Sequence, residues 1–500
     1  MPVLDRTVKP MVTTVRRRFA VALASAAALV LGGCSSPTLR TPARSPTGDP
    51  GAAAPDLDAL ARIDGVTAGG AAVLGALGVR KWSLGNGLQI ITAPDPTARS
   101  VSYVTTYRVG SRDEDAGAGQ TGLAHFCEHL MFTENHGKSG PSEFDRQLEA
   151  MGGNGNATTA YDFTSYTDDG PPEALDGIIR LEARRMAKVD LSPGEIARER
   201  EIVIEERLQS AEDDIDGQLD ELVHEQAFRA HPYRWPIVGR MADIRAVTPD
   251  AVAAFFAAHY AANRATIVIA GRFDEAAALR EIVSAYGELP ALAGVPAPAI
   301  VPERAPDHEV RSAVARAVPA DRIMVGLPAP GLGDPDRAAY ELLDELLTGG
   351  PSSRLQRALL VDRELASSVD AEVDPTRDPG LLTIVVQMRK GERAATAEQL
   401  IRREIDRLST APAPPAEMEA ARNRLETAFW RALASSAARA ELLGAFDATT
   451  GDFRTLAGRS GAYAAVTGGD VSRVAAAWLG AGARSVVVAH PLDAAKGAAE

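Results

Sequence analysis

Three polar residues that are close in the sequence could together perform metal-dependent hydrolysis. His125 and His129 are four residues apart, so on a helix both imidazoles project from one face, with Glu128 beside them. Two such histidines can bind zinc, and a neighbouring carboxylate can take a proton from a water molecule. With 8 His and 67 acidic residues among 500, this His-x-x-Glu-His pattern is expected by chance fewer than about 0.02 times per chain. The zinc interpretation is therefore favoured over a pair of ordinary surface or core histidines.

A helix further along the chain offers a third ligand. Glu199 and Glu206 are seven residues apart and project onto the helix face that carries Ile196, Ile202 and Val203. Because a carboxylate on an apolar face needs a partner, Glu206 is the candidate third ligand and Glu199 a candidate supporting residue. We expect one zinc ion per chain. The alternative is a solvated helix whose glutamates pair with arginines four residues away.

The segments around these residues predict a sheet with helices packed on it. Residues 88–92 and 101–109 read as strands of one antiparallel sheet, and residues 156–166 as a single further strand. Ser142 and Pro193 are typical first residues of helices. A continuous apolar run at 265–271 predicts a buried strand that completes the sheet.

The second half of the chain repeats this order of elements. A strand at 322–327, a helix through 340–347 and a strand at 485–489 predict a duplicated domain. We therefore expect the α+β class, with two duplicated domains, each an antiparallel or mixed β-sheet covered by helices. The second copy of the first helix contains no histidine, so the chemistry is assigned to the first half. The predicted parts are listed here: catalytic domain 81–288, Pro-rich linker 289–308, second domain 309–492 and C-terminal tail 493–500.

Composition narrows the class of partner. The net charge of −14 argues against nucleic acid, since no basic patch is present to neutralise phosphates. The two cysteines do not form a disulfide framework. Cys127 is turned about 200° away from each histidine on the helix, so we interpret it as a packing residue.

The N-terminal residues predict export and a membrane anchor. Three arginines at 16–18 precede an apolar run, and Leu31-Gly32-Gly33-Cys34 resembles a bacterial lipobox. We expect residues 1–33 to be a signal peptide, Cys34 to be lipidated, and residues 34–80 to be a flexible tether. The chain would then be anchored on the periplasmic side of a bacterial membrane, with the outer membrane favoured over the inner. The arginines leave Sec and twin-arginine export open.

Residues 82–490 resemble the pitrilysin and mitochondrial-processing-peptidase family of zinc metallopeptidases. The resemblance rests on several motifs in order: His125-x-x-Glu128-His129, Glu206, the run Gly153-Asn154-Gly155-Asn156-Ala157-Thr158, and His231-Pro232-Tyr233. It implies that His125, His129 and Glu206 bind zinc, that Glu128 is the general base, and that Glu199 assists. It also implies two domains that face each other and hold peptides in the enclosed space.

The same resemblance implies a substrate-aligning strand. Asn156 and Ala157 would hold a peptide substrate by β-augmentation, so the expected activity is a zinc-dependent endopeptidase. The alternative is a non-catalytic peptide-binding or scaffold subunit. Family members of that kind typically lose the zinc residues, and all of them are present here.

A second subunit is expected from what the second half lacks. Related enzymes often supply an arginine and a tyrosine from this half, in a stretch that matches residues 359–369. Ser367 occupies the place of the tyrosine, and Arg363 is shifted from the place of the arginine. The resemblance thus implies a related zinc-less partner carrying the missing pair, with a homodimer as the alternative.

Overall fold

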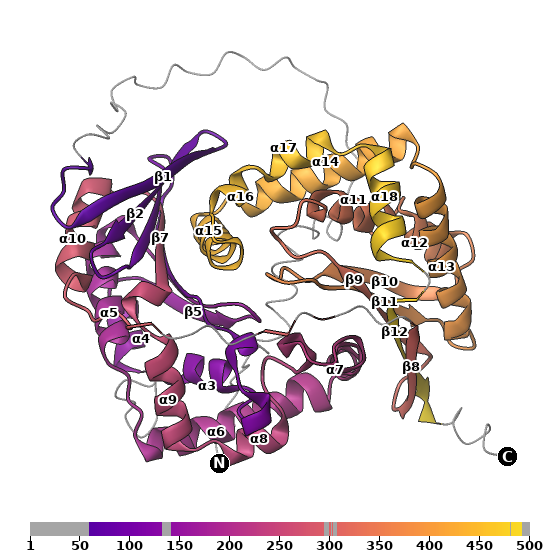
Figure 1. Ribbon diagram of the computed structural model, residues 1–500, viewed down its shortest axis with the longest axis horizontal. Coiled ribbons are helices and arrows are strands. Elements are labelled where there is room, and N and C mark those ends of the chain that lie inside the picture. The colour runs from indigo at the N-terminus through magenta and orange to yellow at the C-terminus, as the bar shows by residue number, and fades with distance from the viewer. Residues whose placement is uncertain are drawn as a thin grey trace, which may run out of the picture.

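The protein is described by a computed structural model that covers residues 60–132, 142–294, 300–301, 303, 308–480 and 482–492. The predicted signal peptide, Cys34 and the C-terminal tail lie outside these residues. Two sheets with their helices form the two sides of the molecule (Figure 1). Among the described residues, none of the helices combines the length and apolar character needed to cross a bilayer.

The first half is built on a seven-stranded mixed sheet. The strands in their spatial order are β1 (Val66–Leu74), β2 (Leu77–Leu84), β3 (Gln89–Pro94), β7 (Ala265–Gly271), β4 (Val101–Tyr107), β6 (Thr164–Gly170) and β5 (Asn154–Thr159). Strands β3 and β7 are parallel, and all other neighbours are antiparallel. The predicted strands at 88–92 and 101–109 share this sheet but are not neighbours, because β7 lies between them.

The tether predicted for residues 34–80 is wrong in its second part. Strand β1 and the start of β2 occupy residues 66–80 and pair with each other in the sheet. The side chains of Leu74 and Val79 are buried. Small residues dominate this hairpin, so its sequence lacks the apolar alternation that identifies most strands.

The single strand predicted for residues 156–166 is instead a hairpin of β5 and β6. Residues 160–163 form the turn, which is closed by a 2.8 Å hydrogen bond from the Ala160 N–H to the Phe163 carbonyl oxygen. The turn contains no glycine or proline, which are the residues that normally mark such a turn in a sequence. The structure therefore places β5 at the outer edge of the described sheet.

The second half repeats the topology of the first, as predicted. Its five strands, in spatial order, are β8 (Glu309–Arg316), β12 (Arg484–Pro491), β9 (Arg322–Ala329), β11 (Gly380–Met388) and β10 (Ala366–Val373). This order matches β3-β7-β4-β6-β5 strand for strand, including the one parallel pair, β8 with β12. The α+β class with duplicated domains is confirmed.

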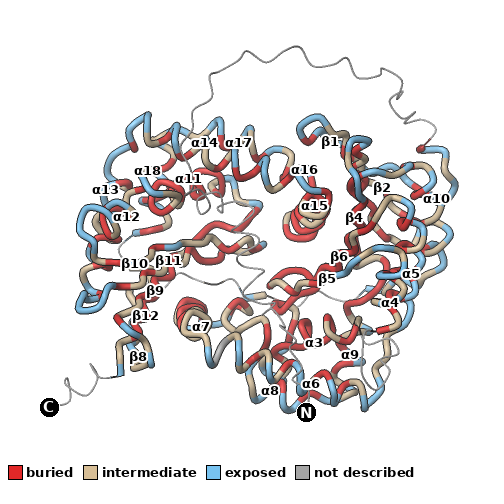
Figure 2. The backbone as a smooth tube through the Cα atoms, turned by 180° about the vertical axis from the view of Figure 1, so that it is seen from behind, coloured by how far each residue is buried: buried red, intermediate tan, exposed pale blue. Residues whose placement is uncertain are grey.

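Helices cover both sheets, and buried residues are found both in the strands and in the helices that pack on them (Figure 2). Those of the first half are α3 (Leu123–Leu130), α4 (Glu143–Ala150), α5 (Leu175–Ala187), α6 (Pro193–Arg207), α7 (Ile215–Ala227), α8 (Met241–Ala246), α9 (Pro249–His259) and α10 (Glu275–Tyr286). Those of the second half are α11 (Arg337–Leu347), α12 (Arg354–Gln356), α13 (Ala394–Thr410), α14 (Pro415–Ala432), α15 (Ser436–Thr450), α16 (Arg454–Ala457), α17 (Arg459–Ala465) and α18 (Gly468–Trp478). Short 3₁₀ turns include η1 (Ser111–Asp113) and η5 (Pro232–Arg234).

Each half contributes one helix to the sheet of the other half. Helix α15 packs on β4 and β7, whereas α7 packs on β9 and β12 (Figure 1). Both crossings depend on a glycine: an added methyl group would overlap the Thr106 hydroxyl at Gly444 and the Val223 side chain at Gly326. The halves are therefore interlocked by close helix–sheet contacts.

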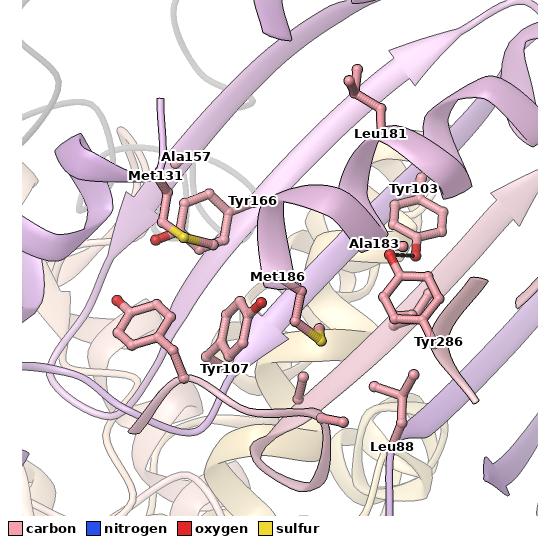
Figure 3. Close-up of a cluster of buried hydrophobic side chains, with 14 of the residues drawn as sticks. Leu88, Tyr103, Tyr107, Met131, Ala157, Tyr166, Leu181, Ala183, Met186 and Tyr286 are labelled. Carbon is pink, nitrogen blue, oxygen red and sulfur yellow. Dashed lines mark hydrogen bonds between the residues drawn. The ribbon is translucent and has the colours of Figure 1, made fainter. Parts of the chain in front are cut away.

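Tyrosine side chains lie among leucine, methionine and alanine side chains in the core of the first half (Figure 3). The hydroxyl groups of Tyr103 on β4 and Tyr286 on α10 lie 2.7 Å apart, and both rings are fully buried. Tyr107 packs edge-to-face on Tyr166 of β6, with ring centroids 5.9 Å apart. These contacts hold α10 and β6 against β4 in the core of the first half.

Candidate metal centre

Helix α3 carries the His-x-x-Glu-His residues. Its first turn is held in place by hydrogen bonds and close packing. Gly122, its N-cap, has a φ of 91° and no side chain to cap the helix. The buried Glu114 carboxylate takes over this role and accepts hydrogen bonds from the N–H groups of Gly122 (2.8 Å) and Ala124 (2.9 Å). A methyl group at Gly122 would also overlap the Val238 carbonyl oxygen. Only glycine meets both requirements at this position.

Helix α6 presents Glu199 and Glu206 towards α3. Ile196 and Val203 are fully buried, and Glu199 on the same face is only 5% exposed. Ile202, which we predicted on this face, is 45% exposed. On a helix, this residue projects about 120° from Ile196, at the margin of the buried stripe. Glu206 lies one turn beyond Val203 and faces the two histidines.

Three ligand atoms converge between α3 and α6. The Oε2 atom of Glu206 lies 3.7 Å from His125 Nε2 and 3.3 Å from His129 Nε2, and the three atoms lie within 4.8 Å of one another. Tetrahedral zinc at about 2.0–2.1 Å from each ligand would separate its ligands by about 3.3 Å. Within the described residues, the buried Glu206 Oε1 and His125 Nδ1 have no hydrogen-bond partner. The donor set and its spacing fit a zinc ion.

The surroundings set the charge of each histidine. Burial lowers the pKa of His125 to about 4, so its imidazole is neutral at pH 7 and can donate a lone pair. Burial also acts to lower the pKa of His129, but hydrogen bonds with Glu199 and Glu206 raise it to about 10. The Nδ1 atom of His129 lies 3.4 Å from Glu199 Oε2. This contact orients the ring so that Nε2 faces Glu206.

Glu128 stands beside the metal-ligand group without joining it. Its carboxylate is 4% exposed and accepts a short hydrogen bond from the hydroxyl of Thr159, the last residue of β5. Burial raises the pKa of Glu128 to about 7, although His129 and Thr159 both act to lower it. A carboxyl group with this pKa can exchange a proton near neutral pH.

The predicted substrate residues lie on the edge strand next to this group. Asn156 pairs with Thr167 and Ala157 with Tyr166 on the inner side of β5. Strand β5 also packs against α3. Its outer edge faces no other strand within the described part of the chain.

Cys127 lies on α3 but is not part of the metal-ligand group. Cys127 is fully buried, and burial raises the pKa of its thiol, as expected for a packing residue. Cys34 lies outside the described residues.

In the second half, a buried ion cluster stands where the first half has its metal-ligand group. Helix α11 follows β9 as α3 follows β4, and its Glu341 carboxylate accepts hydrogen bonds from Arg337, Arg459 and Tyr463. Burial acts to raise the pKa of Glu341, but the two guanidiniums lower it to about 2. In the described residues, His125, His129 and Glu206 are the group able to hold a metal ion. This agrees with assignment of the chemistry to the first half.

Two residues of the site were missed by sequence reasoning. Glu114 caps α3 from eight residues before Gly122, and Thr159 reaches Glu128 from the end of β5. Neither position carries a motif that singles it out. Thr159 reaches the site only because β5 packs beside α3. Arg363 and Ser367, which lie in the stretch that matches the family's arginine and tyrosine, are both exposed.

Known proteins resemble this chain in sequence and in fold. A zinc protease of Helicobacter pylori, PqqE, is 27% identical over 341 residues, covering 67% of this chain and 76% of the relative. The crystal structure of a protease from Helicobacter pylori superposes with a TM-score of 0.77 at 25% identity, covering 83% of this chain and 99% of that chain. Mitochondrial-processing peptidase subunit beta of Lentinula edodes is 25% identical and covers 79% of this chain and 86% of its own length.

Two family models match successive parts of the chain. The model described as insulinase (peptidase family M16) matches residues 89–240, which include the metal-ligand group. The model described as the peptidase M16 inactive domain matches residues 246–425. The predicted resemblance to the pitrilysin and mitochondrial-processing-peptidase family is confirmed: this chain belongs to peptidase family M16.

Proposed function

We propose that this chain is a zinc-dependent endopeptidase that hydrolyses peptides or unfolded segments. One observation carries the proposal: the Nε2 atoms of His125 and His129 and a carboxylate oxygen of Glu206 converge beside the buried carboxylate of Glu128. Relatives named zinc proteases support the same chemistry. The match of the second half to the inactive-domain model is consistent with a single metal site per chain.

The residues around the metal site have separate roles. Bound zinc would supply Lewis acidity, which polarises a peptide carbonyl and acidifies a water molecule. Glu128 accepts the proton of the attacking water and then delivers it to the leaving amine. Thr159 holds the Glu128 carboxylate by a hydrogen bond, and Glu199 holds the ring of His129.

Strand β5 would bind the substrate. An extended peptide can add to its outer edge and form backbone hydrogen bonds along Asn156 and Ala157. Because β5 packs against α3, a peptide bound there would pass close to Glu128. Recognition through backbone groups selects an extended conformation more than a particular side chain.

Metal removal and replacement test this proposal. The purified chain is incubated with a peptide mixture after chelation and again after addition of one equivalent of zinc. We expect cleavage with zinc, none after chelation and recovery on re-addition. Peptide binding without cleavage in the zinc-loaded chain would contradict the endopeptidase and support the scaffold alternative.

We also propose that the chain is exported and anchored through a lipid on Cys34, with the outer membrane as its site. The Leu31-Gly32-Gly33-Cys34 sequence after an apolar run supports this. Mass spectrometry of the membrane fraction should find an acylated Cys34 in the wild type and an uncleaved precursor in Cys34→Ser. An unmodified Cys34 in that fraction would contradict the proposal.

A related zinc-less subunit is the proposed partner. Ser367 lies on β10, where its hydroxyl donates to the Gln387 carbonyl oxygen at 3.3 Å, so its side chain is directed to its own sheet. It is also shorter than the tyrosine whose place it occupies, and therefore cannot reach as far towards a substrate. One relative is by name a subunit of mitochondrial-processing peptidase. Purification from the native membrane should yield a complex with a second chain. A fully active preparation of this chain alone, as monomer or homodimer, would contradict it.

A further inference from the structure

A loop of the second half meets the turn of the substrate hairpin. The loop covers residues 374–379 between β10 and β11, and the turn covers residues 160–163 between β5 and β6. Asp162 in the turn is buried, with 2% exposure. Its partners come from both halves of the chain.

The Asp162 carboxylate collects three hydrogen-bond donors. Its Oδ1 atom accepts from Arg112 Nη1 at 2.8 Å and from the Tyr233 hydroxyl at 2.9 Å. Its Oδ2 atom accepts from the backbone N–H of Arg377, in the second-half loop, at 2.9 Å. A buried carboxylate that is satisfied in this way is held firmly, because each lost partner would leave charge uncompensated.

Asp378 extends the contact from the second half. Its Oδ2 atom accepts from Arg112 Nη2 at 2.6 Å and lies 3.1 Å from His231 Nε2. Its backbone N–H donates to the Tyr233 hydroxyl at 3.2 Å. The His231 hydrogen bond and the nearby Arg112 charge hold the pKa of Asp378 below its ordinary value, so it is charged at neutral pH. Arg112 thus bridges two carboxylates, one from each half.

The second-half loop is itself rigidly held. The Thr376 hydroxyl donates to the Asp378 carbonyl oxygen at 2.9 Å. Arg337, from the core of the second half, donates to the Asp374 carbonyl oxygen at 2.7 Å. The loop at 374–379 is therefore a fixed support against which the turn of the hairpin is held.

The turn is connected to the site through its backbone. The N–H groups of Ser111 and Arg112 donate to the carbonyl oxygens of residues 160 and 161, at 3.2 and 3.0 Å. Thr159 directly precedes these residues and binds Glu128. Displacement of Arg112 would therefore move the residue that holds Glu128.

We propose that Asp378 is a positioning residue of the peptidase site: by holding Arg112, it fixes the turn of the β5–β6 hairpin and, through Thr159, the Glu128 carboxylate. The second half would thus order the catalytic half without contacting the reacting atoms. This inference rests on the proposed endopeptidase function.

The test compares Asp378→Asn with a matched control, Asp216→Asn. Asp216 on α7 also bridges the halves, accepting from Arg322 Nη2 on β9 at 2.5 Å. The side chains of the two aspartates are 35% and 38% exposed, so each substitution removes a comparable ion pair. Only Asp378 contacts the residues that hold the hairpin turn.

Hydrogen exchange gives a readout that does not require activity. In Asp378→Asn, we expect faster exchange of the backbone amides of Ser111, Arg112 and Ala160, because their hydrogen bonds hold the turn. Asp216→Asn should leave these amides at the wild-type rate. Equal exchange in all three proteins would overturn the proposal.

Kinetic measurements then distinguish misplacement of the Glu128 carboxylate from a general weakening of the contact between the two halves. With zinc content equal, Asp378→Asn should lower kcat at least about fivefold with little change in KM, because misplacement of a catalytic group acts on the transition state. Asp216→Asn should remain within about twofold of the wild type. Equal kcat values for the two variants would overturn the proposal.

A double-mutant cycle tests whether Asp378 acts on Glu128 through Thr159. If Asp378 acts through Thr159, the combined Asp378→Asn and Thr159→Val variant should lose less activity than the product of the two single losses. Independent, multiplicative losses would contradict that route. A wild type with full zinc and no cleavage would contradict the proposed function instead, while the exchange measurement would still test Asp378.

Discussion

The hydroxyl of Thr159 donates a hydrogen bond to the carboxylate of Glu128, from 31 positions further along the chain. Thr159 ends the edge strand β5, and Glu128 lies on the helix with the two zinc-ligand candidates. The strand proposed to bind the substrate is thereby tied to the proposed base. In the proposed mechanism, this one hydrogen bond would couple peptide binding to proton transfer.

Removal of the Thr159 hydroxyl should affect rate and pH dependence together. Burial raises the pKa of Glu128 to about 7, and the Thr159 hydrogen bond acts to lower it by favouring the charged form. Thr159→Val should therefore raise this pKa and move the acidic limb of the kcat/KM profile to higher pH, because the base must be deprotonated. We expect a loss of about tenfold at neutral pH.

The neighbouring Thr158 supplies the control for that experiment. It lies on the same strand and projects to the opposite face of the sheet. Thr158→Val should leave the position of the acidic limb unchanged. A Thr159→Val profile identical to that of the wild type would show that the hydrogen bond has no part in proton transfer.

The third zinc ligand can be tested one residue at a time. Glu206→Gln should lower zinc occupancy, because a neutral amide is a weaker ligand than a carboxylate. Glu205→Gln should retain full zinc, since Glu205 is exposed and projects away from the histidines. Metal analysis after dialysis measures both. Full zinc in a folded Glu206→Gln variant would remove Glu206 from the ligand set.

The site was predictable from sequence where it depends on local geometry. The spacing of His125 and His129 defines one helix face, and the prediction that a helix begins at Ser142 is confirmed, because Ser142 is the N-cap of α4. Thr159 was not predictable, because its contact with Glu128 depends on which strands pair. Local periodicity contains no information about that pairing.

The same limit explains the missed features of the fold. The turn at 160–163 lacks glycine and proline, and the hairpin of β1 and β2 lacks apolar alternation. The exchange of α7 and α15 between the halves was also beyond prediction, since an amphipathic helix does not specify which sheet it covers. Small residues such as Gly444 are visible in the sequence, but their close contacts are not.

The close contact at Gly444 predicts an unusual stability effect. Alanine has a higher helix propensity than glycine by roughly 0.5–1 kcal/mol, yet its methyl group would overlap the Thr106 hydroxyl. Gly444→Ala should therefore destabilise the chain by about 1–2 kcal/mol. Gly461→Ala in α17 has open space around it and should be neutral or stabilising. Denaturant midpoints of the two variants measure the difference, and equal midpoints would contradict the packing of α15.

In the proposed mechanism, Glu128 activates water at a zinc site formed by His125, His129 and Glu206. The most direct measurement is zinc content and peptide cleavage of Glu128→Gln beside the wild type, with Glu205→Gln as control. We predict full zinc in all three proteins, wild-type cleavage in Glu205→Gln, and a loss of about a thousandfold or more in Glu128→Gln. Wild-type cleavage by a zinc-loaded Glu128→Gln variant would contradict the account.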